Sequence, residues 1–401
     1  MSKSIVVLAY SGGLDTSYCI KYLTEEKGMT VHAVLVDTGG FSKEEIKTIE
    51  EKAYLLGAAK FVHKYTVPRY YKACVRYLIY GNILRNNTYP LSVSAERVFQ
   101  ALEIVEYANA VQASSVAHGS TGAGNDQVRF DLAFQVLGHE LDIITPIRDM
   151  RLSRQEEVSY LKKHGVDLTW SKAQYSINQG LWGTSVGGRE TLTSHLRLPN
   201  DAYPSQLSTQ EEKTIKLHFS NGELVGVDDQ SYEDPVAAIE SLTKIVQAYA
   251  IGRDVHVGDT IIGIKGRVGF EAGGPLVIIK AHHLLEKHTL TKWQQYWKEQ
   301  LANWYGMLLH EGQYLEPVMR NIEGFLEDTQ SSVTGQVEVK LFPYRFELVG
   351  VQSENDLMQS RFGSYGEENK TWNHEEAKGF IKILSTPLKN YYSVHKKASD
   401  D

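Results

Sequence analysis

The segment Ala9–Ser17 combines residue types that bind anions. It reads Ala-Tyr-Ser-Gly-Gly-Leu-Asp-Thr-Ser and directly follows an apolar run at positions 5–8. Its two adjacent glycines let the backbone turn tightly, and the helix expected after the turn directs its positive N-terminal end at the same point. The serines and the threonine add hydroxyl donors, while Asp15 could cap the helix or approach a metal-bound phosphate. The segment therefore predicts a binding site for an anionic group.

The spacing within this segment excludes two common phosphate-binding motifs. A Walker A loop needs a lysine after its glycines, and a dinucleotide-binding loop needs Gly-x-Gly-x-x-Gly; neither pattern is present. The motif Ser11-Gly12-Gly13-x-Asp15-Thr16-Ser17 resembles the pyrophosphate loop of the N-type ATP pyrophosphatases. That resemblance implies cleavage of ATP between its α and β phosphates and adenylation of a carbonyl or ureido oxygen. The alternative is a turn that only caps a core helix, which the uninterrupted strand–turn–helix context disfavours.

The segment His118–Phe130 is the second region with dense functional groups. It reads His-Gly-Ser-Thr-Gly-Ala-Gly-Asn-Asp-Gln-Val-Arg-Phe, and its glycines expose backbone amides. Asp126 could pair with an ammonium group, and Arg129 could bind a carboxylate in bidentate fashion. This combination suits an amino acid zwitterion. A glycine-rich turn with a helix cap and one surface ion pair is the alternative.

Histidines provide weaker candidates for chemistry. No single general base is evident, and His118 is either a proton acceptor or a strand-end histidine that is merely hydrogen-bonded. His282, His283 and His288 lie close together in the sequence, but neither a nearby cysteine nor a Glu-x-x-His pattern accompanies them. We therefore interpret these three as solvated or core histidines and predict no metal site from them.

Strands that alternate with helices are expected to position both segments in a first domain over residues 1–168. The apolar runs that predict strands are 5–9, 31–36, 61–65, 115–118 and 141–145. Helices are expected between them, including 70–80, 95–113 and one opened by the capping box at 153–156. This order predicts an α/β fold with a doubly wound parallel sheet. The loops 10–17, 37–40 and 119–126 would then meet at the carboxyl ends of the strands, where such sheets bind ligands.

The pattern changes after about residue 168, and a second, α+β domain is expected over residues 169–380. The stretch Trp170–Asn200 has little period and is rich in Ser, Gly and Trp, which suits a substrate-binding loop. Alternating apolar residues around Asn221-Gly222 predict a hairpin, and Asp234-Pro235 predicts the start of a helix. Further strands are expected at 261–264, 276–280, 333–341 and 345–351.

Two apolar helix faces are expected toward the C-terminus. A helix over Thr291–His310 carries large apolar side chains at spacings of three and four, namely Trp293, Trp297, Leu301, Trp304 and Leu308. We interpret this stripe as part of the core or of a subunit interface rather than as a ligand site. A helical tail is expected over residues 381–401, with a face that could dock on a neighbouring subunit and a frayed polar end at 396–401.

Composition narrows the class of protein. The 401 residues are 42% hydrophobic and 23% charged, as in ordinary soluble globular proteins. The net charge of −7, with no basic run longer than Lys396-Lys397, does not favour a nucleic-acid partner. Cys19 and Cys74 cannot form a disulfide framework and fit a reducing compartment. The apolar opening is too short for a signal peptide, and no segment approaches the roughly 20 apolar residues of a membrane span. We expect a cytoplasmic protein without a membrane or nucleic-acid partner.

The two segments Ala9–Ser17 and His118–Phe130 together resemble the argininosuccinate synthase family. The resemblance implies a homotetramer that joins citrulline and aspartate at the expense of ATP, with Mg²⁺ neutralising the phosphates, and that releases AMP and pyrophosphate. It assigns ATP binding to Ala9, Tyr10, Ser11, Gly12, Gly13, Leu14, Asp15, Thr16, Ser17, Val36 and Gly119. It assigns aspartate to Thr121, Asn125 and Asp126, and citrulline to Tyr89, Ser94, Asn125, Arg129, Ser176 and Ser185. Asp15, Asp126 and Arg129 are the residues expected to act in catalysis.

The sequence departs from the family pattern in the second domain. Gly258 and Phe270 stand where family members commonly carry a glutamate and a tyrosine that contribute to the citrulline site. Either a nearby acid such as Asp259 replaces the missing carboxylate, or the substrate is an N-acylated citrulline that has no ammonium group there. The segment Ser176–Ser185 also lacks the expected acidic character, although both serines keep their spacing.

Two other classes of function stay open at this point. Another adenylating amidotransferase or a tRNA-thiolating enzyme would need a glutaminase domain, a reactive cysteine or a basic RNA-binding face, and none is seen. A non-catalytic nucleotide-binding module that kept the fold is the remaining alternative.

Overall fold

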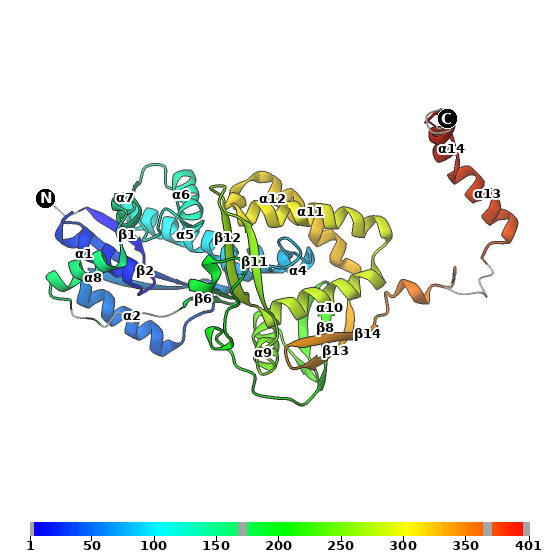
Figure 1. The fold of residues 1–401 in the computed structure, drawn as a ribbon, viewed down its shortest axis with the longest axis horizontal. Coiled ribbons are helices and arrows are strands. Elements are labelled where there is room, and N and C mark those ends of the chain that lie inside the picture. Colours follow the sequence, from blue (N-terminus) through cyan, green and yellow to red (C-terminus); the bar gives the residue numbers. More distant parts are fainter. Residues whose placement is uncertain (1–3, 167, 169–174, 364–370, 396–401) are drawn as a thin grey trace. The chain divides into compact units, whose positions relative to one another are not determined.

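A computed structural model describes residues 4–166, 168, 175–363 and 371–395 (Figure 1). The chain divides into two compact units, Met1–Ser353 and Glu354–Asp401. In the described residues, no helix combines the length and the apolar character that crossing a bilayer requires.

A five-stranded parallel sheet forms the N-terminal part of the first unit. Its strands are β1 (Ile5–Ala9), β2 (Thr30–Asp37), β3 (Lys60–Tyr65), β4 (Ser115–Ala117) and β5 (Asp142–Ile144). They lie in the order β3-β2-β1-β4-β5, and every neighbouring pair is parallel. This arrangement confirms the predicted doubly wound α/β fold.

Helices cover both faces of this sheet. They are α1 (Leu14–Glu25), α2 (Lys43–Leu56), α5 (Ser92–Ala110), α6 (Asp126–Leu137), α7 (Pro146–Met150) and α8 (Arg154–Lys163), whereas α3 (Val67–Tyr70) and α4 (Arg76–Tyr80) pack in the core of the part that follows. Val6 and Leu8 of β1 pack in one apolar cluster with α1, α2 and α8, whereas Val7 packs in another with α5 and α6. Side chains alternate along the strand, so one strand supplies both layers. The expected helix over 70–80 is present as α3 and α4 joined by a π turn at Tyr71–Val75.

Two antiparallel sheets follow. One has the order β10-β9-β8-β13-β14, and the other has the order β11-β12-β7-β6. The strands are β6 (Ser176–Gly180), β7 (Gly183–Gly187), β8 (Lys213–Ser220), β9 (Glu223–Val227), β10 (Gln230–Ser231), β11 (Arg253–Asp259), β12 (Lys265–Glu271), β13 (Gly335–Phe342) and β14 (Arg345–Gln352). The predicted hairpin is confirmed: Asn221 and Gly222, both with positive φ, join β8 to β9.

The helices of this part are α9 (Pro235–Gln247), α10 (Gly273–Thr289), α11 (Lys292–His310) and α12 (Pro317–Asp328). Asp234 caps α9 through a hydrogen bond from the Val236 amide, as predicted. Single 3₁₀ turns lie at Arg189–Leu192, Asn200–Ala202, Gln313–Leu315, Thr329–Ser332 and Leu357–Gln359. The largest apolar core joins α9, α10 and strands β8 and β13 to α4 and α5 of the N-terminal part.

Three expectations for this part were wrong. Residues 276–280 belong to α10 rather than to a strand, and residues 261–264 form the turn between β11 and β12. The run Val277-Ile278-Ile279 is buried on every side, and a short buried apolar run has no period that separates a helix from a strand. The stretch expected to be irregular over 170–200 contains the β6–β7 hairpin, while residues 170–174 lie outside the described part.

The apolar faces near the C-terminus are exposed in the single chain. Trp293, Trp297 and Trp304 of α11 are each more than half exposed, so they are not core residues of one subunit. The second unit contains α13 (His374–Leu384) and α14 (Thr386–His395), neither of which buries any residue. The helical character of the tail is confirmed up to residue 395, and the end at 396–401 lies outside the described residues.

Candidate functional site

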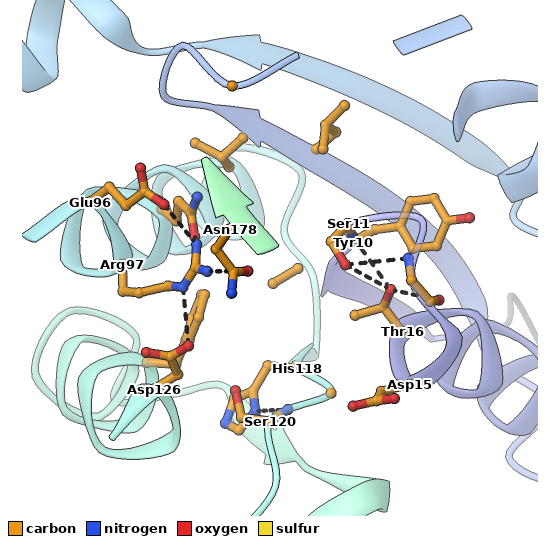
Figure 2. A pocket seen from close by; sticks show the side chains of 18 of the residues that line it. Tyr10, Ser11, Asp15, Thr16, Glu96, Arg97, His118, Ser120, Asp126 and Asn178 are labelled. Atoms are coloured by element: carbon orange, nitrogen blue, oxygen red, sulfur yellow. Dashed lines mark hydrogen bonds and ion pairs between the residues drawn. The ribbon is translucent and has the colours of Figure 1, made fainter. Parts of the chain in front are cut away.

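The turn between β1 and α1 forms the first half of the site. Gly12 has a φ of +76°, and a Cβ there would lie 2.8 Å from the Ile49 side chain, so the turn requires glycine. Lys52 fixes the turn from outside by donating to the Gly12 carbonyl oxygen at 2.9 Å. The hydroxyls of Ser11 and Thr16 lie 3.3 Å apart at the mouth of the turn (Figure 2). Backbone amides, two hydroxyls and a helix N-terminus therefore converge, as binding of a phosphate chain requires.

The turn between β4 and α6 packs directly against the first turn. A Cβ at Gly119 would lie 3.1 Å from the Thr16 methyl group and 3.2 Å from the Asp15 backbone, so the two turns are in contact. A cavity of about 860 Å³ lies between them and is bordered on another side by β6 (Figure 2). This volume is within the range of small-molecule sites.

Most of the residues assigned to ATP and aspartate line this cavity. They are Ala9, Tyr10, Ser11, Gly13, Leu14, Asp15, Thr16, Val36, Gly119, Thr121 and Asp126, and of the citrulline set Ser176 joins them. The predicted residues outside its wall are Gly12, Ser17, Tyr89, Ser94, Asn125, Arg129 and Ser185. Ser17 is fully buried, so its hydroxyl does not reach the cavity in this conformation.

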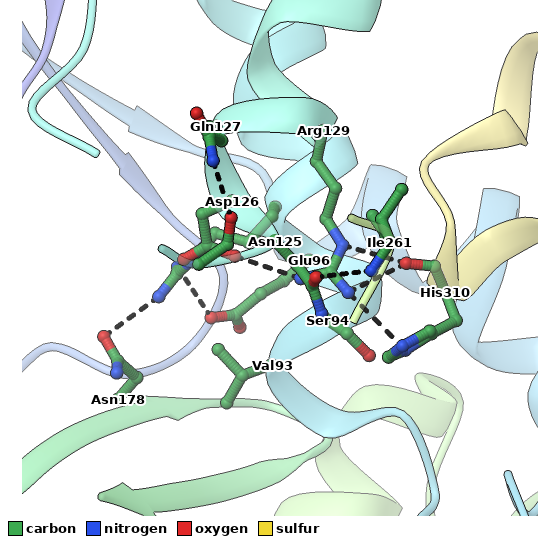
Figure 3. Close-up of polar contacts among 12 residues, drawn as sticks. Val93, Ser94, Glu96, Asn125, Asp126, Gln127, Arg129, Asn178, Ile261 and His310 are labelled. Carbon is green, nitrogen blue, oxygen red and sulfur yellow. Dashed lines mark hydrogen bonds and ion pairs between the residues drawn. The ribbon is translucent and has the colours of Figure 1, made fainter. Parts of the chain in front are cut away.

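Asp126 and Arg129 are ion-paired to each other rather than free. Their side chains are 3.0 Å apart, and Arg129 also donates to the His310 carbonyl oxygen at 2.8 and 3.1 Å (Figure 3). The Arg129 side chain is 4% exposed, whereas that of Asp126 is 41% exposed and faces the cavity. Of the pair, Asp126 is the one open to a ligand here.

Asn125 and the remaining citrulline candidates lie around the second sheet. The Asn125 side-chain oxygen accepts from the Ile261 amide at 2.8 Å, which links α6 to the β11–β12 turn. Tyr89 is buried, and its hydroxyl accepts from the Ser92 hydroxyl and the Val93 amide at 3.2 Å each. The buried Ser94 hydroxyl donates to the Leu91 carbonyl oxygen. Thus the structure places these side chains in internal contacts.

Other side chains occupy the space around Gly258 and Phe270, the two positions that depart from the family pattern. Phe270 is fully buried, packs on Tyr89 with ring centroids 5.3 Å apart, and pairs with Ser185 across β12 and β7. A Cβ at Gly258 would lie 2.8 Å from the His256 ring. The Asp259 carboxylate already pairs with Lys265 at 2.7 Å on an exposed edge.

Sequence reasoning missed the charged group at the centre of the cavity wall. Arg97 donates to the carboxylates of Glu96 and Asp126 at 3.1 Å each and to the Asn178 side chain of β6 at 2.9 Å (Figure 2). It also donates to Gln100 at 2.8 Å. The only signal in the sequence is a charged pair at the start of α5, a helix that is otherwise mostly apolar and buried.

Glu96 is enclosed by three segments. It is 1% exposed, its second oxygen accepts from the Thr38 hydroxyl at 2.8 Å, and the Gly180 backbone of β6 packs directly on it. Burial raises the pKa of Glu96 to about 7, against the opposing effects of Arg97 and of the Thr38 hydrogen bond. The two arginines have the opposite effect on Asp126: they outweigh its desolvation and lower the pKa of that carboxyl.

His118 fits the interpretation of a merely hydrogen-bonded histidine. Its Nε2 lies 2.8 Å from the Asp131 carboxylate, and its Nδ1 accepts from the Ser120 amide at 3.2 Å. Both ring nitrogens are therefore engaged, and neither has a free lone pair for a substrate proton.

A carboxyl pair stands behind the first turn. Glu157 of α8 is 3% exposed and shares a hydrogen bond with Asp15. Burial, the Asp15 charge and this hydrogen bond raise the pKa of Glu157 to about 8. The second Glu157 oxygen is buried without a hydrogen-bond partner.

Both parts of the chain match models of one protein family. Residues 5–167 match the model of the family described as the arginosuccinate synthase N-terminal HUP domain, and residues 175–391 match that of the arginosuccinate synthase C-terminal domain. The chain is 36% identical to the argininosuccinate synthase of Dictyoglomus thermophilum over 413 residues, which covers 100% of both chains. It is also 36% identical to that of Methanocaldococcus jannaschii, over 94% of this chain and 95% of the relative. The argininosuccinate synthase of Xanthomonas campestris pv. campestris is 36% identical over 99% of this chain and 100% of the relative.

Proposed function

The chain belongs to the argininosuccinate synthase family, and we propose that its cavity carries out the reaction of that family on free citrulline, aspartate and ATP. The protein is an ATP-dependent C–N ligase. The observation that supports the assignment of the site is the contact between the two turns, because the 9–17 turn and Asp126 then line one cavity.

The first step activates citrulline. A ureido oxygen is a poor leaving group, so it must become an adenylate by attack on the α-phosphate of ATP, with pyrophosphate departing. The amides of the 9–17 turn and the hydroxyls of Ser11 and Thr16 would hold the departing pyrophosphate. The contribution of these groups is positioning and charge stabilisation.

The second step joins the two amino acids. The aspartate amine attacks the activated carbon, and AMP leaves. Asp126, open to the cavity and fixed by two arginines, would hold the ammonium group of aspartate before attack. Thr121 and Asn125 complete the proposed aspartate site. Tyr89, Ser94, Arg129, Ser176 and Ser185 complete the proposed citrulline site, although all of these except Ser176 are now held in internal contacts or lie outside the cavity wall.

A divalent cation fits the carboxyl pair behind the phosphate loop. Carboxylate oxygens are the ligands that Mg²⁺ prefers, and the buried unpaired oxygen of Glu157 beside Asp15 is a group that a cation would satisfy. Asp15 and Glu157 would hold Mg²⁺. When bound, it would neutralise charge on the phosphates of ATP.

The family resemblance also implies that the protein forms an oligomer. We propose a homotetramer whose interfaces cover the exposed tryptophans of α11 and, separately, the apolar side chains of α13 and α14. A reducing, cytoplasmic setting is part of the same proposal, since both cysteines are buried free thiols.

An N-acylated citrulline is not proposed. The space near Gly258 is taken by His256, and Phe270 is fully buried, so these positions open no room for an acyl group. Neither residue lines the cavity.

A pyrophosphate-release assay tests the proposed function. Purified protein with ATP and Mg²⁺ is given citrulline, acetylcitrulline or succinylcitrulline, each with and without aspartate. We expect stoichiometric AMP, pyrophosphate and argininosuccinate only with free citrulline and aspartate together. Pyrophosphate release independent of both amino acids, or a preference for an acylated substrate, would overturn the proposal.

A further inference from the structure

We propose that the Glu96 carboxylate accepts the proton that the aspartate ammonium group loses before its nitrogen attacks the citrulline adenylate. This inference rests on the proposed function and assigns a residue to a step for which the sequence offered no base. Glu96 lines the same cavity as Asp126, and Arg97 donates to both carboxylates, so the two acids are held on either side of one guanidinium (Figure 2). An ammonium group bound at Asp126 therefore shares one cavity with Glu96, and the Arg97 guanidinium links the two carboxylates.

The other acidic residues and the histidine in the described cavity wall make contacts that suit them to other roles. Asp15 faces the phosphate loop and Glu157, and Glu45 caps α2 through Ser42, which lowers its pKa. His118 has both ring nitrogens engaged. Asp126 is kept ionised by its two arginines and is suited to bind a cation rather than to take its proton. Glu96 is the group whose pKa of about 7 suits proton exchange at neutral pH.

The charged groups that face Glu96 explain this proton affinity. Arg97 on its own helix favours the ionised form, but its charge is shared with Asp126 of α6. Asp37 at the end of β2 adds a second negative charge and is itself paired with His63 of β3. On the β6 side the contacts are the Gly180 backbone and, through Arg97, the neutral Asn178. Burial therefore raises the pKa of Glu96 by more than Arg97, whose charge is shared with Asp126, lowers it.

One N–H proton of the ammonium group moves to a Glu96 oxygen, and the freed lone pair forms the C–N bond to the activated carbon. The C–O bond to AMP then breaks with its electron pair on the phosphate oxygen. That oxygen takes the second proton of the attacking nitrogen, and Glu96 returns its proton to water after AMP leaves.

Two half-reactions separate this role from a structural one. Citrulline-dependent exchange of labelled pyrophosphate into ATP, measured without aspartate, reports adenylation alone. Argininosuccinate formation reports both steps. In Glu96→Gln we expect the exchange to stay within about twofold of wild type and ligation to fall about 100-fold or more, as for loss of a general base. The acidic limb of kcat/KM for aspartate, centred at a pH of about 7 in wild type, should disappear.

Glu103 provides a matched control on the same helix. It is also buried and also accepts from a threonine, Thr66, and an arginine, Arg69, but it lies outside the cavity wall. Glu103→Gln should leave both half-reactions and the pH profile unchanged. Glu96→Asp keeps a carboxylate at shorter reach and should restore part of the ligation rate together with the acidic limb, which keeps the test valid if Glu96→Gln folds poorly.

Three results would overturn the assignment. Ligation that persists in Glu96→Gln would remove Glu96 from the proton path. Equal losses of exchange and ligation in a folded variant would assign it to site architecture instead. Wild-type protein that shows neither exchange nor ligation would overturn the proposed function, and this inference with it.

Discussion

Two charge clusters in the first unit each contain a buried glutamate beside a cation, but the pKa of the glutamate is raised in one cluster and lowered in the other. The pocket cluster consists of Glu96, Arg97, Asp126 and Arg129. The core cluster, between α4, α10 and α11, consists of Asn82, His282, Glu286, Lys298 and Gln330. Each has a glutamate that is at most 1% exposed beside a cation. Yet the pKa of Glu286 lies below its ordinary value, whereas that of Glu96 is raised.

The difference lies in how the cation is shared. Lys298 is 2.8 Å from Glu286, donates otherwise only to the Tyr80 carbonyl oxygen at 2.7 Å, and faces no second carboxylate among the recorded contacts of the described residues. With His282 and Gln330 it outweighs the desolvation of Glu286. Arg97 divides its charge between Glu96 and Asp126, and one side of that cluster opens to the cavity. A closed cluster fixes a fold, while an open one leaves a carboxyl able to exchange a proton.

Lys298→Met should have the largest effect on stability. It leaves the Glu286 charge buried without its main partner, and loss of one member of a buried pair costs about 3–5 kcal/mol. Urea unfolding measures the change, and Lys287→Met, at an exposed position of α10, is the control. Comparable stability of the two variants would show that the core cluster is not a closed ion pair.

Asp126→Asn should act on aspartate binding and, less strongly than Lys298→Met, on stability. The amide keeps the size of the carboxyl but removes the charge that pairs with Arg97 and with the buried Arg129, together with the proposed charge-assisted contact to the aspartate ammonium. Such contacts are worth about 1.5–3 kcal/mol, which is roughly a 10- to 100-fold loss in kcat/KM for aspartate. Steady-state kinetics with aspartate varied would detect it. Asp149→Asn, on the exposed end of α7, should behave as wild type. Unchanged aspartate kinetics in Asp126→Asn would separate the pocket cluster from substrate binding.

The pH dependence of stability should differ in sign between the two glutamates. The folded pKa of Glu96 is about 7 and the ordinary value is 4.5, so between these pH values the folded protein holds a proton that the unfolded chain releases. Its contribution to stability therefore declines as pH rises through this window and stays low above it. Glu96→Gln removes that decline, a difference on the order of 1–3 kcal/mol.

Glu286 behaves in the opposite way because its folded pKa is lowered. Its contribution is present above its ordinary value of 4.5 and is lost as pH falls through the lower folded value. Chemical denaturation of wild type, Glu96→Gln and Glu286→Gln across the acidic and neutral range measures both slopes. If the stability contributions of Glu96 and Glu286 changed with pH in the same direction, the two clusters would not differ in the way described.

Much of this site was predictable because it is local in the chain. The turn 9–17 lies between one strand and one helix, and its glycine requirement follows from a backbone turn that the sequence displays. The parallel sheet followed from the alternation of elements. The run 276–280 failed because burial on all sides removes the period that separates a helix from a strand.

The pocket cluster was not predictable in the same way. Glu96 and Arg97 stand at the start of a helix, where charged residues usually face solvent. Their role depends on Asn178, which lies 81 residues further along the chain, and on a strand that the sequence did not predict. Arg129 was assigned to a substrate from its type, but the His310 carbonyl oxygen that engages it lies 181 residues away. Contacts at such separations come from tertiary packing alone.

Thr38→Val should have the smallest effect. It removes the hydroxyl that stabilises the ionised form of Glu96 at 2.8 Å and should move the acidic limb of ligation upward by about 0.5–1 pH unit. Thr66→Val, which removes the equivalent contact to Glu103, is the control. A limb that does not move in Thr38→Val would mean that another group sets it.

Direct titration of the Glu96 carboxyl tests the central claim most closely. Infrared difference spectra of wild type minus Glu96→Gln isolate the carbonyl stretch of the protonated Glu96 carboxyl as pH is varied. The account predicts that this band is lost at a pH of about 7. Loss of the band at or below the ordinary value of 4.5 would show that the Glu96 carboxyl is ionised throughout the neutral range, as that of Glu286 is, and would contradict the account.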